Sequence, residues 1–306
     1  MTLKSNAPIP LEYIQTVIGH HLDGTITALE PVEGGNFSSA FSFRIGERDY
    51  IIRFNSSEEA YEHEVYLSSL LHPQGVPYPQ VFGKGRKDGF TYCISQRAAG
   101  KIVANLKPEQ KSALLPDLIR VIAMMNQVDL RGASGYGFLG KDNNGQFASW
   151  EAFVRSFFSE EQTGTFWEGW YRYFHTTCLE KDVFDECYAR LLEHCRYNAP
   201  HRHFVHHDCH AWNILSDGQS ITGIIDGNCI YGDFLIDIAT IESAFPGIDL
   251  AERFRLHYER IGFEVPDFQE RLTGARYFKG IDGMRFYAMM GWEDAYKQLR
   301  DRLLAL

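Results

Sequence analysis

The most informative run in this chain of 306 residues is Val205-His206-His207-Asp208-Cys209-His210-Ala211-Trp212-Asn213-Ile214-Leu215. Within it Asp208 stands five residues before Asn213, and Asp226 follows Asn213 by thirteen. Two short strand-like runs, 213–215 and 221–225, flank a turn, so a tight hairpin brings three oxygen-bearing side chains together. Carboxylate and amide oxygens suit Mg²⁺. The spacing therefore predicts phosphoryl transfer, in which Asn213 and Asp226 hold the cation and Asp208 accepts the proton of an attacking hydroxyl.

The segments before this run predict an antiparallel sheet with helices inserted. Some of them repeat apolar residues at helical spacing, and others alternate apolar and polar residues around polar turns. We expect helices at 10–22 and about 58–71, and strands at 37–45, 50–54, 80–85 and 90–96.

The pattern changes after Ala98-Ala99-Gly100, where helical spacing becomes dominant. We expect helices at about 114–125, where Pro116 is a kink or a start, and at 149–158, 166–175, 181–194, 235–245, 250–261 and, with interruptions, 268–304. The predicted fold class is therefore α+β. Residues 1–98 form a first, antiparallel β lobe, and residues 99–306 form a second, mainly helical lobe.

Composition limits the class of partner. The 40 acidic and 30 basic residues give a formal net charge of −10, which argues against nucleic acid and favours a cationic ligand. Residues 1–11 lack the apolar stretch of a secretory signal, and no apolar run approaches the about 18 residues of a membrane span. The six cysteines form no CxxC pair, as is typical of reduced thiols. We expect a cytoplasmic monomer with no membrane or nucleic-acid partner.

Three motifs carry a family resemblance: His206-x-Asp208-x-x-x-x-Asn213, Ile225-Asp226 and Gly232-Asp233-x-x-x-Asp237. Together they resemble the aminoglycoside phosphotransferase family. Residues 33–43, 50–55 and 91–100 are similar to the same family, in particular to its hygromycin B phosphotransferase branch, and the likeness runs from about Leu29 onward. The resemblance implies a protein-kinase-like two-lobed fold, bound Mg²⁺, and transfer of the γ-phosphoryl group of ATP to a hydroxyl of a small molecule.

The resemblance also implies roles for individual residues. The family's catalytic base falls on Asp208, its metal ligands on Asn213 and Asp226, its loop-bracing histidine on His206, and two structural carboxylates on Asp233 and Asp237. The implied nucleotide contacts are Gly34, Gly35, Asn36, Phe37 and Ser38 of a phosphate-covering loop, Arg53 and its acidic partner Glu64, and Gln96 and Ala98, whose backbone faces adenine. Glu62 is the alternative partner of Arg53.

Three positions depart from the family pattern. Arg53 stands where Lys is usual, and its guanidinium can still pair with phosphates although with different geometry. Gly227-Asn228 follows Asp226 where an aromatic residue is common, and Trp212 precedes Asn213 where a small residue is common. For the acceptor, the late helices offer Glu242, Asp282, Glu293 and Asp294, which predict an acidic site for an aminoglycoside-like cation, as in antibiotic resistance.

Other interpretations of the sequence stay open. A kinase of the same fold acting on choline, homoserine or a sugar fits the same motifs, and so does a nucleotide-binding module without catalysis. Gly34-Gly35 is also consistent with a plain turn. A zinc site is a further hypothesis, built from His201, His203, His206, His207 and His210 with Cys209 and Cys229. A serine hydrolase is disfavoured because the chain has no GxSxG elbow.

Overall fold

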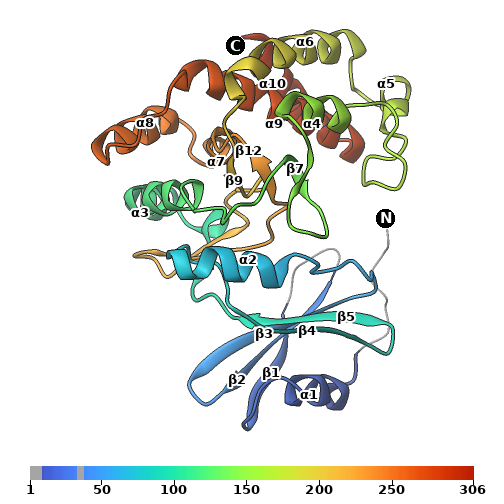
Figure 1. The fold of residues 1–306 in the computed structure, drawn as a ribbon, viewed down its shortest axis with the longest axis vertical. Coiled ribbons are helices and arrows are strands. Elements are labelled where there is room, and N and C mark those ends of the chain that lie inside the picture. Colours follow the sequence, from blue (N-terminus) through green and yellow to red (C-terminus); the bar gives the residue numbers. More distant parts are fainter. Residues whose placement is uncertain (1–8, 33–37) are drawn as a thin grey trace. The chain divides into compact units, whose positions relative to one another are not determined.

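The computed structural model describes residues 9–32 and 38–306, shown as a ribbon in Figure 1. Its contacts divide the chain into two compact units. The first holds the described residues up to Ile102 together with Ile214–Ile225, and the second holds Val103–Asn213 and Asp226–Leu306. The expected α+β composition, with antiparallel strands first and helices afterwards, is confirmed.

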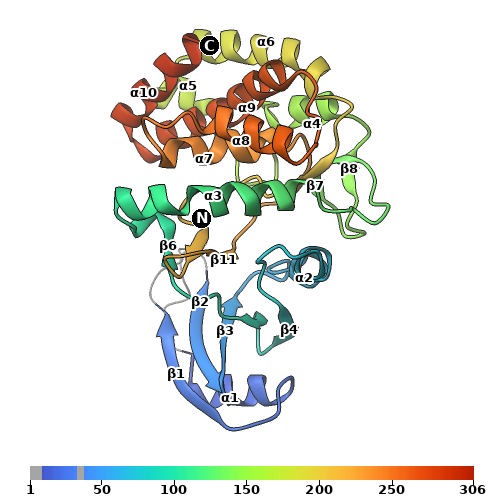
Figure 2. The ribbon, with the colours of Figure 1, turned by 90° about the vertical axis from the view of Figure 1, so that its left-hand side faces the viewer.

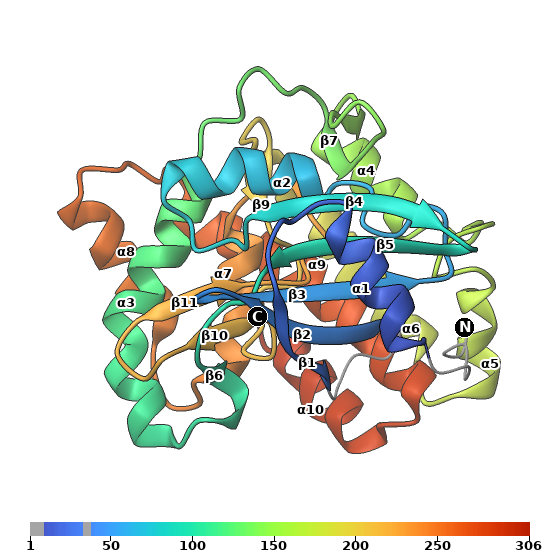
Figure 3. The same cartoon turned by 90° about the horizontal axis from the view of Figure 1, so that it is seen from below.

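The first unit is built on a five-stranded antiparallel sheet with the order β1-β2-β3-β5-β4. Its elements are α1 (Leu11–Gly19), β1 (Ile26–Val32), β2 (Ser39–Ile45), β3 (Arg48–Asn55), α2 (Glu64–Leu71), β4 (Val81–Lys87) and β5 (Phe90–Gln96). Apolar side chains of α1, among them Ile14 and Ile18, pack in one core cluster with Ile52 and Phe54 of β3. Figure 3 shows α1 lying across this sheet.

Two differences from the predicted elements have local causes. β1 was not expected, because it is an edge strand whose burial does not alternate and which contains Pro31, tolerated only at an edge. Helix α2 begins at Glu64 rather than near residue 58. The chain before it forms turns, and Tyr61 has a φ of +61°, a left-handed conformation that a helix cannot contain.

A small sheet explains why residues 214–225 join the first unit. Strand β10 (Ile214–Ser216) pairs with β11 (Ile221–Ile224) and with β6 (Lys101–Ile102). The Ile224 N–H also donates to the carbonyl of Pro77 at 2.9 Å. The sequence predicts this hairpin but assigns it, with all of 99–306, to the second lobe. The compact units differ from that division at the hairpin and at residues 99–102.

The second unit is mainly helical, with a four-stranded sheet in the order β8-β7-β12-β9. Its elements are α3 (Pro108–Asn126), β7 (Tyr136–Leu139), β8 (Gly145–Phe147), α4 (Trp150–Phe157), α5 (Tyr173–Thr176), α6 (Lys181–Asn198), β9 (His203–Val205), β12 (Ile230–Gly232), α7 (Leu235–Ile241), α8 (Leu250–Arg260), α9 (Phe268–Met290) and α10 (Glu293–Leu304). Helix α9 packs against α6, α7 and α10 (Figure 2). No helix among residues 9–32 and 38–306 has the length and apolarity needed to cross a membrane.

Most predicted helices of this unit are present, with one exception. The helix expected at 166–175 is replaced by a 3₁₀ turn at Trp170–Arg172 and the four-residue α5. Gly169 has a φ of +70°, so the backbone leaves the helical region at that residue. Pro116 lies inside α3, which begins at Pro108.

Candidate active site

The loop that follows β9 is fixed by a buried carboxylate of α7. The Asp237 Oδ2 accepts the backbone N–H of His206, and its Oδ1 accepts that of His207, each at 2.9 Å. Asp237 is fully buried, and burial raises its pKa to about 7 even though these two hydrogen bonds act in the opposite direction. His207 has a φ of +66°, a conformation that non-glycine residues rarely adopt. The carboxylate therefore holds an unusual backbone shape just before Asp208.

The structure brings together the three oxygen-bearing residues that the sequence singles out. The Asn213 Nδ2 donates to the backbone carbonyl and to the Oδ2 of Asp208, both at 3.0 Å, and to the backbone carbonyl of Asp226 at 3.4 Å. Because the amide nitrogen is used in this way, Oδ1 is the atom that Asn213 can offer to a cation. Asp226 is exposed and has a φ of +55°. The side chains of Asp208 and Asn213 therefore meet as predicted, and the backbone of Asp226 lies beside them.

Asp208 is surrounded by groups that favour its ionised form. Partial burial acts to raise its pKa, but a hydrogen bond from His210 and electrostatic attraction to the surrounding donors, among them Lys279, outweigh it, so the pKa lies well below its usual range. The His210 Nε2 is 3.4 Å from the Asp208 Oδ1. The side chain is therefore a carboxylate at neutral pH, able to accept a hydrogen bond from a hydroxyl.

His206 and Gly227 explain one departure from the family pattern. His206 is fully buried. A Cβ added at Gly227 would lie 2.9 Å from ring atoms of His206 and 2.6 Å from the Cys229 Sγ, closer than carbon atoms approach. Glycine at this position therefore lets the chain after Asp226 pass against His206, which a larger residue would displace.

The histidines of this region do not form a metal site. Within the described ranges no group of three or more His, Cys, Asp or Glu side chains is placed to hold a metal ion. His203 lies edge-on to Phe234 with ring centroids 4.8 Å apart. Burial lowers the pKa of His203 to about 4 and that of His207 to about 3, so both rings are neutral. Among the described residues, the zinc hypothesis therefore has no convergent set of ligands to support it.

The first unit contains the predicted ion pair of a nucleotide site. The Arg53 Nη2 is 2.9 Å from the Glu64 Oε1, and both side chains are largely buried. The Arg53 guanidinium lies 4.9 Å from the centre of the Tyr61 ring, and the Tyr78 hydroxyl donates to the other oxygen of Glu64 at 3.1 Å. Helix α2 begins at Glu64, whereas Glu62 lies in the turn before it. These contacts fix the guanidinium on β3.

The other residues predicted to contact the nucleotide lie partly outside the described residues or already use their backbone groups within the chain. Gly34, Gly35, Asn36 and Phe37 lie outside the described residues, and Ser38 directly precedes β2. Gln96 ends β5, and its N–H is already used by the carbonyl of Gln80 at 2.8 Å. The side chain of Ala98 abuts Gly223, where a Cβ would approach it to 2.5 Å. A backbone donor from this segment to a base therefore has to come from a residue other than Gln96.

Three of the four predicted acceptor carboxylates, Glu242, Asp282 and Glu293, have cationic partners within the chain, and the fourth, Asp294, is exposed in the first turn of α10. Glu242 follows α7 and pairs with Arg276 of α9 at 2.6 Å. Glu293 begins α10, is mostly exposed, and lies 3.7 Å from Lys297. Asp282 of α9 pairs with Arg285 at 3.0 Å and with Lys279 at 3.7 Å.

Each of Glu242, Asp282 and Glu293 pairs with a basic side chain, so these three do not form the cluster of unpaired carboxylates expected for a cationic acceptor. Of these three, Asp282 connects to the loop that carries Asp208, through Lys279, whose Nζ donates to the His207 carbonyl. No motif in the sequence points to Lys279, or to Arg271, whose guanidinium is buried against Asp233. The available signal was the presence of basic residues among the apolar residues of α9.

These features have counterparts in known proteins. Residues 28–271 match the sequence profile of the phosphotransferase enzyme family, APH, and the chain belongs to that family. The chain is 26% identical over 242 residues to hygromycin-B 4-O-kinase of Escherichia coli, an alignment that covers 77% of this chain and 68% of the relative. The predicted family resemblance is therefore confirmed.

Solved structures agree with the sequence comparison. A thermostable mutant of aminoglycoside phosphotransferase APH(4)-Ia, in ternary complex with AMP-PNP and hygromycin B, superposes with a TM-score of 0.75 at 25% identity, covering 95% of this chain and 96% of that one. Spectinomycin phosphotransferase APH(9)-Ia, in complex with ADP and spectinomycin, has a TM-score of 0.60 at 14% identity, with 96% and 95% covered. Because the identity is only 14%, the second comparison shows a shared fold and nothing more.

Proposed function

We propose that the chain is an ATP-dependent O-phosphotransferase that transfers the γ-phosphoryl group to a hydroxyl of an aminoglycoside-like acceptor. The observation that carries this proposal is the geometry of Asp208. Its carboxylate is held by Asn213 at 3.0 Å on a loop whose backbone is fixed by Asp237. The same segment lies within the part of the chain that matches the phosphotransferase family.

Asp208 orients the acceptor hydroxyl and accepts its proton. A carboxylate with a lowered pKa is a weak base, so it takes the proton late, as the oxygen becomes bonded to phosphorus. Its main contribution is orientation, which depends on a rigid loop. The hydrogen bonds of Asp237 and Asn213 supply that rigidity before any substrate arrives.

The oxygen donors beside Asp208 fit Mg²⁺. Nucleotide sites hold this ion with one or two protein carboxylates or amide oxygens together with phosphate oxygens. Asn213 can offer Oδ1 and Asp226 a carboxylate, which is a hard, all-oxygen donor set. When bound, Mg²⁺ neutralises the phosphates as negative charge moves to the leaving ADP.

Arg53 contributes positive charge toward the phosphates of ATP. Glu64 and Tyr61 hold its guanidinium, so little side-chain entropy is lost on contact with an anion. Arginine differs from lysine in presenting several donors in a plane, which favours contact with two oxygens at once. We therefore assign Arg53 the nucleotide contact that lysine makes elsewhere in the family.

The acceptor is proposed to be a cationic, hydroxyl-rich molecule. The relative with 26% identity is a kinase of hygromycin B. The net charge of −10 favours the approach of an amino-sugar over that of an anionic metabolite. A cytoplasmic location fits the use of ATP and the six cysteines, all free and five of them buried.

The test is direct phosphorylation. The protein is incubated with Mg-ATP and a panel of hygromycin B, other aminoglycosides, choline, homoserine and sugars, and products are identified by mass spectrometry. We expect a mass increase of one phosphoryl group on an aminoglycoside. Phosphorylation of a metabolite alcohol alone would replace the proposed acceptor, and the absence of any product would overturn the activity.

Paired variants assign the product to the site. Asp208→Asn keeps the size of the side chain and removes its basicity, so turnover falls while ATP still binds. Asp185→Asn is the matched control, because this exposed aspartate of α6 pairs only with Lys181 among the ion pairs described for it. Equal turnover in Asp208→Asn and wild type would refute the role of Asp208.

A further inference from the structure

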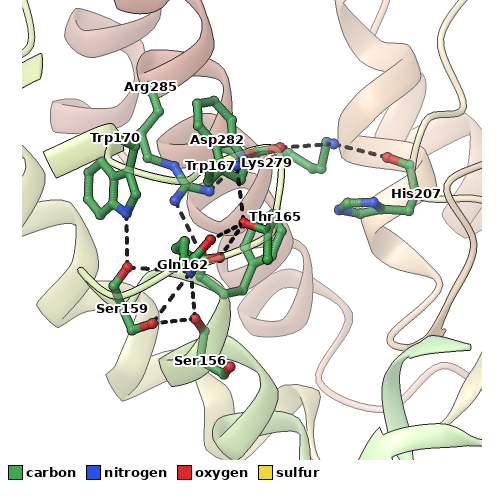
Figure 4. Close-up of polar contacts among 11 residues, drawn as sticks. Ser156, Ser159, Gln162, Thr165, Trp167, Trp170, His207, Lys279, Asp282 and Arg285 are labelled. Atoms are coloured by element: carbon green, nitrogen blue, oxygen red, sulfur yellow. Dashed lines mark hydrogen bonds and ion pairs between the residues drawn. The ribbon is translucent and has the colours of Figure 1, made fainter. Parts of the chain in front are cut away.

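We propose that Lys279 is a positioning residue for phosphoryl transfer and that Asp282 and Arg285 hold it in place. The inference rests on the proposed function and deepens it. Lys279 donates from Nζ to the carbonyl oxygen of His207 at 2.9 Å (Figure 4). That carbonyl belongs to the peptide bond that joins His207 to Asp208, so the contact sets the orientation of the backbone from which the carboxylate of Asp208 extends.

The loop needs such an anchor because Asp237 holds only one side of it. Asp237 accepts the N–H groups of His206 and His207, and neither of these hydrogen bonds involves the carbonyl of His207. The left-handed φ of His207 costs energy, and it persists only because the surrounding contacts enforce it. Lys279 supplies that contact, because its charged ammonium group donates a hydrogen bond to the carbonyl oxygen of His207.

Lys279 is itself held by a chain of charged groups on α9. Asp282, one turn further along the helix, has its Oδ2 3.7 Å from the Lys279 Nζ and its Oδ1 3.0 Å from the Arg285 Nη2. The Lys279 side chain is only 17% exposed, which limits its alternative rotamers. The carboxylate therefore stands between two cations and keeps the ammonium directed at the loop (Figure 4).

Arg285 is enclosed by aromatic side chains. Its side chain is fully buried, and its guanidinium lies within 5.0 Å of the centres of four aromatic rings: Trp167 at 4.3 Å, Phe158 at 4.6 Å, Trp170 at 4.8 Å and Phe157 at 5.0 Å. Its Nη1 also donates to the Phe157 carbonyl at 3.2 Å. A desolvated cation gains most from such ring contacts. It follows that Asp282 balances a buried charge and is not free to serve as an acceptor ligand.

The aromatic rings are held in turn by the segment that carries them. Gln162 donates from Nε2 to the carbonyls of Ser156 at 2.7 Å and Phe157 at 2.9 Å, and the Trp170 indole donates to the carbonyl of Ser159 at 2.9 Å (Figure 4). A continuous series of contacts thus runs from this segment through Arg285, Asp282 and Lys279 to the loop of Asp208.

Two variants separate positioning from folding. Lys279→Met keeps the length and apolar stem of the side chain and removes the donor, whereas Lys279→Arg retains a donor. Lys181→Met is the matched control, since Lys181 is an exposed helical lysine that pairs with Asp185 at 2.7 Å. We expect Lys279→Met to lower kcat by roughly ten- to a hundredfold, with the Kd for ATP and the Tm close to wild type, and Lys279→Arg to recover most of the loss.

Asp282→Asn tests the same series of contacts by a different parameter. If Asp282 positions Lys279, the variant should have a lower kcat with little change in the KM for the acceptor. If Asp282 binds the acceptor, the variant should have a higher KM with kcat retained. The second result would overturn the assignment of Asp282.

Hydrogen–deuterium exchange provides a readout that does not depend on the acceptor. We expect faster exchange in the peptide 205–213 of Lys279→Met and no change in Lys181→Met. Unchanged exchange would overturn the proposal, and so would a loss of kcat that follows a loss of Tm and of ATP binding in parallel. If wild type phosphorylates nothing, the proposed function fails on its own account, and the exchange of this peptide still decides whether Lys279 fixes the loop.

Discussion

Arg271→Met should destabilise the second unit far more than the loss of any surface charge. The guanidinium is 1% exposed and Asp233 is 0% exposed. Two hydrogen bonds join them, from Nε to Oδ2 at 2.8 Å and from Nη2 to Oδ1 at 2.9 Å. In the variant, the carboxylate keeps only the Asn198 amide at 2.7 Å and the Leu235 N–H at 3.1 Å among its described donors. An ionised group then stays buried without a counter-charge.

The expected cost follows from that arrangement. Removing one partner of a buried ion pair costs about 3–5 kcal/mol, because the desolvation penalty of the remaining charge is no longer offset. For a unit of this size, each kcal/mol corresponds to about 2–4 °C in Tm, so the midpoint should fall by about 6–20 °C. Urea and thermal unfolding followed by circular dichroism measure both quantities.

A matched control and a double variant make the test strict. Arg255→Met removes an exposed pair with Glu252, at 44% and 45% exposure, and should cost less than about 1 kcal/mol. Asp233→Asn combined with Arg271→Met should cost less than the sum of the two single variants, because the buried charge is gone. Equal losses in Arg271→Met and Arg255→Met would refute the reasoning.

Three further predictions concern the site. Asp226→Ala should abolish Mg²⁺-dependent binding of ATP, measured by calorimetry with and without the metal, while retained metal dependence would contradict its role as a ligand. Arg53→Met should weaken ATP binding by roughly tenfold, as one lost charge-assisted contact implies, and Arg53→Lys should restore part of it; an unchanged Kd in Arg53→Met would contradict the nucleotide contact. His207 is neutral in the folded protein, since burial lowers its pKa from 6.5 to about 3. The unfolded chain therefore takes up a proton below pH 6.5 that the folded chain does not. The free energy of unfolding should then fall from pH 6.5 towards pH 3, by at most about 1.4 kcal/mol per pH unit from this group. His207→Asn, which tolerates the left-handed backbone, should reduce that slope in urea titrations at several pH values. The raised pKa of Asp237 acts in the opposite direction but is common to both proteins, so an identical slope would contradict the assignment.

The sequence predicted those parts of the structure whose signals are local. Strands β2 and β3 alternate apolar and polar residues around a polar turn, and they pair as expected, with Ala40 opposite Arg53. The convergence of Asp208, Asn213 and Asp226 follows from two short strands and one turn. Such features depend on neighbours within a few residues, which a single sequence displays.

Features that depend on distant partners could not be predicted. The acceptor role expected of Glu242 ignores Arg276, which is far along the chain and meets it only because α9 packs on α7. The rings around Arg285 belong to residues 157–170, and nothing local in α9 points to them. Strands β9 and β12 have three residues each, too few for alternation to be recognised.

Helix α9 places restrictions on how this chain can evolve. It carries Arg271, Lys279 and Arg285, which contact three different segments of the second unit, and Asp282, which pairs with both Lys279 and Arg285. At 1.5 Å per residue, Arg271 and Arg285 are about 21 Å apart along one rigid rod. Inserting or deleting a single residue between Arg271 and Lys279 turns everything beyond it by about 100° relative to Arg271, so the contacts of Lys279 with the loop and of Arg285 with its aromatic rings fail together. Homologues that retain this machinery should therefore align through 271–285 without a gap, and variation there should take the form of substitutions only.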